Sequence, residues 1–144
     1  MQTVVAVDPG VTTGVAVLRS FKGQTRVERT FVSRYPHEGL GEQLLNVNAD
    51  YIVAERGPSR RRQPEACLIV EQILYELFPD RVEWVRPAEW KGHPRSALPP
   101  GVYPRTLHER DACGMGLFAL WRAWVSSLKA PDGPRLQNLP RGRG

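Results

Sequence analysis

A single carboxylate at the end of a buried strand constrains the fold of this chain more than any other feature of its sequence. Residues 2–7 are continuous, apolar and rich in valine, which predicts a strand covered on both faces. The run ends at Asp8, Pro9-Gly10 predicts a tight turn, and residues 14–18 predict a second strand. A buried carboxylate is costly unless it is paired or binds a metal ion. Asp8 is therefore a candidate functional residue, and an Asx turn with Pro9-Gly10 is the alternative.

The predicted strand over residues 51–55 also ends in a carboxylate. Residues 51–55 are apolar up to Glu55, and an arginine-rich loop follows. That loop carries Arg56, Arg60, Arg61 and Arg62. The chain has a formal net charge of +5 at pH 7, and clustered basic residues favour a polyanionic partner such as nucleic acid. Two alternatives stay open: Glu55 pairs with one of these arginines, or the arginines form a solvated loop without a partner.

The rest of the chain completes an α/β pattern. Apolar periodicity and turn residues predict, in order, a strand over residues 26–33, helices over 37–46 and 63–78, a strand over 82–85, a loop over 92–104 and a helix over 106–128. Thr106 and Glu109 have capping-box spacing at the start of the last helix. This order predicts a mixed five-stranded sheet with helices on both faces, the order of the ribonuclease H-like fold. We expect one domain over residues 1–128 and a basic, disordered tail over residues 129–144.

The sequence carries no sign of a membrane span or of export. No run of about 18 apolar residues is present, and no basic region with an apolar core precedes the first strand. Cys67 and Cys113 fall in predicted helices without metal-binding spacing, which favours buried thiols of a reduced protein. We therefore expect a cytoplasmic protein.

The last predicted helix carries two further candidates. His108 and Asp111 are three residues apart and share one face of this helix. Ala112, Gly114 and Gly116 are small, and glycine costs about 1 kcal/mol relative to alanine inside a helix. Two glycines here therefore predict close packing of the helix against another element.

If this helix lies on the sheet beside the first strand, His108 and Asp111 reach the strand ends that carry Asp8 and Glu55. Clustered carboxylates repel one another, and Mg²⁺ or Mn²⁺ relieves the repulsion because these ions prefer oxygen ligands. Two such ions about 3.5–4 Å apart support phosphodiester hydrolysis. The alternatives are that Asp111 is a salt-bridged helix residue and that His108 is an ordinary first-turn histidine.

Four segments together resemble the RuvC-type Holliday junction resolvases of the retroviral-integrase superfamily. Residues 5–17 resemble the first motif of that family, and residues 52–55 resemble the second. Residues 85–91 are similar to its strand, proline and lysine turn, and residues 108–112 resemble its final helix. The resemblance implies a homodimeric, Mg²⁺- or Mn²⁺-dependent crossover junction endodeoxyribonuclease of DNA recombination and repair. Such an enzyme makes paired, symmetric nicks in four-way DNA junctions.

The resemblance also implies roles for individual residues. Asp8, Glu55 and Asp111 would be metal ligands, with two ions in each active site. His108 would replace a further acidic residue, as a ligand or a general base, and Lys91 would contact the scissile phosphate. The residues expected to bind DNA are Arg56, Arg60, Arg61, Arg62, Lys91, Arg95 and Arg105. The chain departs from the family because no aromatic wedge follows Glu55 and a Pro-rich segment follows Lys91.

Oligomeric state and several other functions stay open. The predicted helix over residues 63–78 is apolar over a wide arc, which predicts a packing partner besides the sheet. A homodimer supplies that partner, and a second element of the same chain is the alternative. A broader nuclease acting on flaps and forks, or a catalytically inactive nucleic-acid-binding module, would have the same fold. The Asp-x-Gly phosphate turn of sugar kinases and actin-like ATPases needs a longer, two-domain chain, and we expect no small-molecule cofactor.

Overall fold

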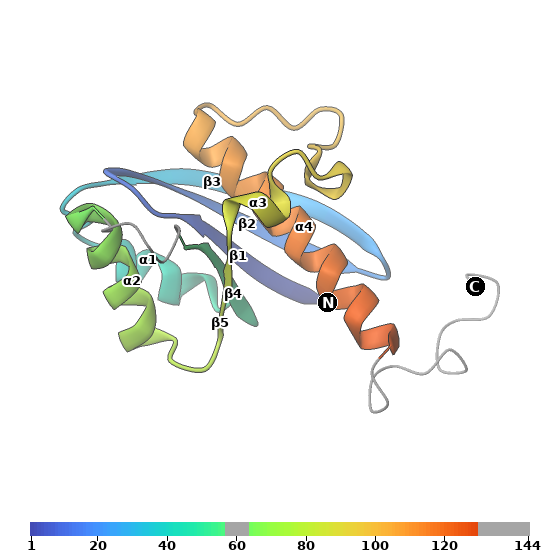
Figure 1. Ribbon diagram of the computed structural model, residues 1–144, viewed down its shortest axis with the longest axis horizontal. Coiled ribbons are helices and arrows are strands. Elements are labelled where there is room, and N and C mark those ends of the chain that lie inside the picture. Colours follow the sequence, from blue (N-terminus) through green and yellow to red (C-terminus); the bar gives the residue numbers. More distant parts are fainter. Residues whose placement is uncertain (57–63, 130–144) are drawn as a thin grey trace.

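The structure, a computed structural model, describes residues 1–56 and 64–129. Its centre is a five-stranded sheet with the strand order β3-β2-β1-β4-β5 (Figure 1). The strands are β1 (Gln2–Asp8), β2 (Thr12–Phe21), β3 (Gln24–Arg34), β4 (Tyr51–Glu55) and β5 (Val82–Val85). The helices are α1 (Leu40–Val47), α2 (Glu65–Leu77), α3 (Pro87–Trp90) and α4 (Leu107–Lys129), with a 3₁₀ turn, η1, over Pro94–Ser96.

Two kinds of connection make the sheet mixed. β1, β2 and β3 form an antiparallel meander. β4 and β5 run parallel to β1 and are reached through α1 and α2, because a parallel neighbour needs a crossover connection. β1 lies in the middle, and its residues 4–7 are completely buried. Valine and alanine occupy these positions because a central strand needs apolar side chains on both faces.

The side chains of β1 alternate between two separate cores. Val5 and Val7 pack with α1 and α2 on one face of the sheet. Val4 and Ala6 pack with α4 on the other face. Figure 1 shows α1 and α2 on one side of the sheet and α4, with α3 beside it, on the other. The predicted mixed sheet with helices on both faces is therefore confirmed.

Glycines allow α4 to approach the sheet closely. A Cβ on Gly116 would stand 2.6 Å from Leu18 Cδ1 and 3.1 Å from Ala6 Cβ. A Cβ on Gly14, in β2, would stand only 2.0 Å from the backbone oxygen of His108. The close packing that the small residues of α4 predict is present, and Gly14 contributes to it from the sheet side.

The structure corrects three predicted segments. The helix predicted over residues 37–46 begins at Leu40, because His37 has a φ of 67° and is buried below the β1–β2 turn. The sequence pattern predicts no helix where α3 lies, and it predicts a loop over residues 92–104, where η1 lies. A proline begins each of these elements, and both are too short to show a helical period.

The remaining boundaries move by a few residues. β2 and β3 extend past their apolar runs to a two-residue turn at Lys22 and Gly23, whose φ values of 50° and 79° suit a hairpin.

Residues 57–63 and 130–144 lie outside the described residues, so the predicted disordered tail is not tested beyond Lys129. Within the described ranges, no helix combines the length and the apolar character that crossing a bilayer requires.

We expect Gly14→Ala to lower the free energy of unfolding by about 1–3 kcal/mol, because the new methyl group would displace the backbone of α4. Urea denaturation measures this loss. Gly41→Ala in α1 is the matched control, since its methyl group would meet only the side chains of Leu77 and Ile73, at 2.9 and 3.6 Å. Equal losses in the two variants would contradict the close contact between β2 and α4.

Candidate active site

Strand alternation directs Asp8 and Glu55 to the same side of the sheet. Side chains two residues apart on a strand point to the same face, so Asp8 points the same way as Ala6, and Glu55 the same way as Val53. Both Ala6 and Val53 lie in the core under α4. β1 and β4 are parallel neighbours whose register brings the two strand ends level. Neighbouring strands lie about 4.8 Å apart, so the two carboxylates stand at adjacent strand ends.

α4 adds Asp111 to this pair. Asp8 pairs with Gly14 in the β1–β2 ladder, and the carbonyl group of His108 lies against Gly14. Asp111 follows about one turn later on the same helix, and its charge raises the pKa of both Asp8 and Glu55. Among residues 1–56 and 64–129 no ion pair is formed by Asp111. The structure therefore brings together the three carboxylates that the sequence singled out.

Burial and repulsion between carboxylates both act on this cluster. Burial is the largest effect on Asp8, the charges of Glu55 and Asp111 add to it, and the pKa of Asp8 rises from 3.8 to about 7 although Lys91 lowers it. The pKa of Glu55 is also raised, chiefly by burial, against the opposing effects of Lys91 and of a hydrogen bond from Trp90. The ionised cluster is thus costly unless a cation compensates for it.

Two consecutive residues after β5 act on these carboxylates. The charge of Lys91 lowers the pKa of both Asp8 and Glu55. The indole Nε1 of Trp90 donates to Glu55 Oε2 at 2.9 Å, and Trp90 is only 4% exposed. Trp90 therefore fixes one oxygen of Glu55 and leaves the other for a ligand. The sequence does not predict this role, because no local pattern connects Trp90 with a residue in β4.

Buried polar contacts hold the turn that follows Asp8. His37 Nε2 donates to the carbonyl oxygen of Gly10 at 2.8 Å, and Ser33 Oγ donates to His37 Nδ1 at 2.9 Å. The backbone N–H of Gly10 donates to Thr13 Oγ1 at 3.1 Å. On the other side, the thiol of Cys67 donates to the carbonyl oxygen of Pro9 at 3.5 Å. These contacts join β3 and α2 to the turn and limit its movement.

The predicted basic residues differ in what they contact. The guanidinium carbon of Arg56 lies 4.3 Å from the ring centroid of Trp84, and Arg56 also donates to the Tyr75 hydroxyl. Its Nε is 3.9 Å from Glu71 Oε1, so Arg56 is bound to β5 and α2 and does not pair with Glu55. Lys91, Arg95 and Arg105 are exposed. Arg60, Arg61 and Arg62 lie outside the described residues.

The candidate metal ligands have suitable chemistry but do not form a ready-made ligand group. Among the described residues, no three His, Cys, Asp or Glu side chains are arranged to hold a metal ion. Asp8, Glu55 and Asp111 nevertheless offer oxygen donors whose mutual repulsion a hard divalent cation would relieve, so the donor set fits Mg²⁺ or Mn²⁺.

His108 is exposed in the first turn of α4, and its ring has no hydrogen bond within the described part of the chain. Its role as a ligand or base stays a prediction.

Comparison with solved structures places the fold. No model of a known protein family matches the chain, and no curated protein matches it either. The structure is similar to T. thermophilus RuvC in complex with a Holliday junction substrate, with a TM-score of 0.65 and 19% sequence identity over 88% of this chain and 97% of that one. A second structure of Thermus thermophilus RuvC gives a TM-score of 0.63 and 19% identity over 86% and 96% of the two chains.

These likenesses concern the fold, since the sequence identity is low. They confirm the predicted ribonuclease H-like architecture. The chain shares the fold of the two RuvC structures over nearly their whole length.

The raised pKa of Asp8 predicts a pH-dependent stability of the metal-free protein. A carboxyl group whose pKa is higher in the folded state destabilises the protein as pH rises from about 4 through 7. Asp8→Asn removes this charge, so we expect the variant in EDTA to melt roughly 2–6 °C above wild type at pH 8, and the gap to narrow toward pH 5. Thermal denaturation across this range measures the gap, and one that widens toward acid pH would contradict the burial of Asp8.

Proposed function

We propose that the chain is a divalent-metal-dependent DNA endonuclease that resolves four-way junctions by paired, symmetric nicks. The convergence of Asp8, Glu55 and Asp111 from β1, β4 and α4 is the observation that carries this proposal. Carboxylates from two adjacent strand ends and one helix form a site that suits metal-assisted phosphodiester hydrolysis. The RuvC fold supports the choice of a branched substrate, because T. thermophilus RuvC was solved with a Holliday junction.

In this mechanism the chain would bind and orient the DNA, and metal ions held at the site would supply an activated water and stabilise the leaving oxygen. Asp8, Glu55 and Asp111 would hold the ions, because hard divalent cations prefer carboxylate oxygen ligands. Trp90 keeps Glu55 in one orientation, as hydrogen-bonded neighbours of metal ligands do. Lys91 would contact the scissile phosphate, because it is exposed and its charge acts on the same carboxylates.

The DNA arms would extend from this site over exposed basic residues. Arg95 and Arg105 are exposed on the segment that joins α3 to α4. Arginine suits this role since its guanidinium group can bind a phosphate through two hydrogen bonds. We include Arg60, Arg61 and Arg62 in the proposed DNA-binding surface on the basis of their sequence alone.

A homodimer would provide the two active sites that paired nicks require. α2 packs on the sheet through Ala66, Val70 and Leu74. Its outer side carries Leu68 and Tyr75, which are 47% and 48% exposed. An exposed apolar patch on a helix suits a two-fold interface, because the same patch meets itself across the axis.

The nuclease proposal predicts metal-dependent cutting that depends on Asp8. We expect wild-type protein to nick labelled four-way junctions in Mg²⁺ or Mn²⁺, and Asp8→Asn to abolish nicking but retain junction binding in EDTA. Asp80→Asn, an exposed residue between α2 and β5, is the matched control and should cut like wild type. Three-way junctions, flaps, forks and linear duplexes in the same panel distinguish a junction resolvase from a broader nuclease. Intact junctions under all metal conditions would leave a nucleic-acid-binding module as the function.

The dimer proposal predicts that one charge on α2 dissociates the protein. Sedimentation velocity at micromolar concentration should find wild type as a dimer and Leu68→Glu as a monomer, because a buried unpaired carboxylate is costly. Leu45→Glu is the matched control, since Leu45 lies on α1 and is equally exposed, at 47%. A monomeric wild type, or equal effects of both variants, would rule out this interface.

A further inference from the structure

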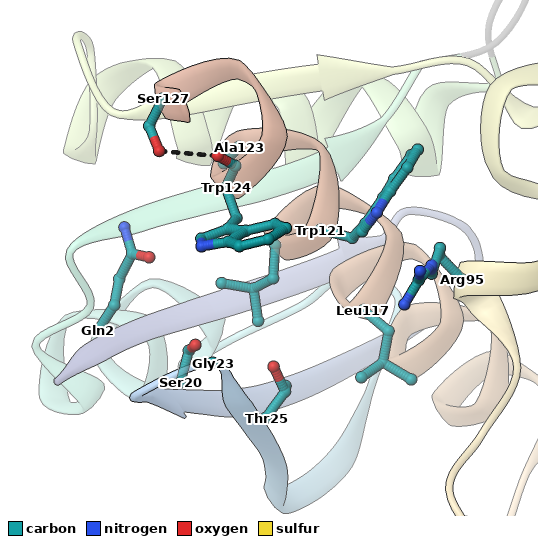
Figure 2. A pocket seen from close by; sticks show the side chains of 11 residues that line it. Gln2, Ser20, Gly23, Thr25, Arg95, Leu117, Trp121, Ala123, Trp124 and Ser127 are labelled. Carbon is teal, nitrogen blue, oxygen red and sulfur yellow. Dashed lines mark hydrogen bonds between the residues drawn. The ribbon is translucent and has the colours of Figure 1, made fainter. Parts of the chain in front are cut away.

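An open groove lies at the end of the sheet opposite the carboxylate cluster. It has a volume of about 650 Å³ and runs between the C-terminal half of α4 and the strand ends around the β2–β3 turn (Figure 2). Gln2 lines it, and on β1 the side chain of Gln2 lies on the same face of the sheet as that of Asp8. The two residues are the first and last of β1, about 20 Å apart along the strand, so the groove is distinct from the candidate active site.

Two indole rings dominate the helix side of this groove. Trp121 is supported by the ring of His93, 5.0 Å away between centroids, and by the guanidinium group of Arg95 at 5.7 Å. Trp124 is 52% exposed, a large fraction for a tryptophan on a helix that packs against the sheet. Figure 2 shows the Trp124 indole lying over the groove, with Ser20 and Thr25 on the opposite wall.

The polar groups of the groove indicate which ligand chemistry it accepts. Its lining includes the amide of Gln2, the hydroxyls of Ser20 and Thr25 and the cation of Arg95, and among the residues that the structure describes no acidic one lines it. A cationic ligand would therefore find no counter-charge there. An exposed aromatic face, hydrogen-bonding groups opposite it and one arginine suit a planar base attached to a phosphate.

We propose that this groove binds unpaired nucleotides of a single strand. The base stacks on Trp124, its polar edge faces Ser20 and Thr25, and the adjoining phosphodiester pairs with Arg95. Stacking of this kind tolerates any base, because every base has an aromatic face. The site requires neither metal ions nor phosphodiester cleavage, so it stands or falls separately from the proposed nuclease activity.

The test measures binding of labelled oligothymidylate, about eight nucleotides long, to the full-length protein in EDTA. Fluorescence anisotropy should show that Trp124→Ala weakens binding roughly 5- to 100-fold, the range expected for one lost stacking contact. Trp124→Phe keeps an aromatic face and should retain most of the affinity. Tyr103→Ala is the matched control, since Tyr103 is 88% exposed and lies outside the groove, and it should bind like wild type.

Three results would overturn the proposal. The first is equal affinity of wild type and Trp124→Ala for the oligonucleotide, or no binding by wild type. The second is a blunt-ended duplex that binds as tightly as the single strand and depends equally on Trp124. The third is protection of Trp124 fluorescence from acrylamide before any oligonucleotide is added, identified by comparison with Trp124→Phe. Protection at all protein concentrations would assign the groove to another segment of this chain, and protection that grows with concentration would assign it to a second copy.

Discussion

The backbone contact between β2 and α4 is the constraint on which the candidate site depends. Gly14 pairs with Asp8 in the sheet. Because Gly14 has no side chain, the carbonyl group of His108 can contact the strand directly at this position. The first turns of α4 are thereby fixed next to the end of β1, and Asp111 acquires its place near Asp8 and Glu55. No single feature of the three carboxylates themselves would bring them together.

The sequence predicted the parts of this arrangement that depend on local patterns. Apolar runs that end in Asp8 and Glu55 identified two strand ends, and strand alternation then determined which face their side chains take. Small residues in α4 indicated a close approach, which the contact of Gly116 with Leu18 confirms. The roles of these acidic residues as metal ligands stay predictions, as does that of His108.

The supporting residues were beyond prediction because they act across long sequence separations. Trp90 meets Glu55 only after β5 and α3 are placed beside β4, and nothing near Trp90 in the sequence indicates a carboxylate partner. The sequence pattern places His37 in a helix, yet its ring lies under the turn at Gly10. His37 forms a hydrogen bond with the turn, and Trp90 forms one with the candidate ligand Glu55. They offset part of the disorder that repulsion within the cluster would otherwise cause.

The alternation of β1 has one further consequence. Gln2, Val4, Ala6 and Asp8 form a single row on the face under α4, so the groove, the core and the carboxylate cluster share one strand register. Inserting or deleting one residue within β1 would turn part of that row toward α1 and α2. The two ends of the face therefore cannot be re-spaced by small steps in chain length. Side-chain substitution is the route by which either end can change while the other is kept.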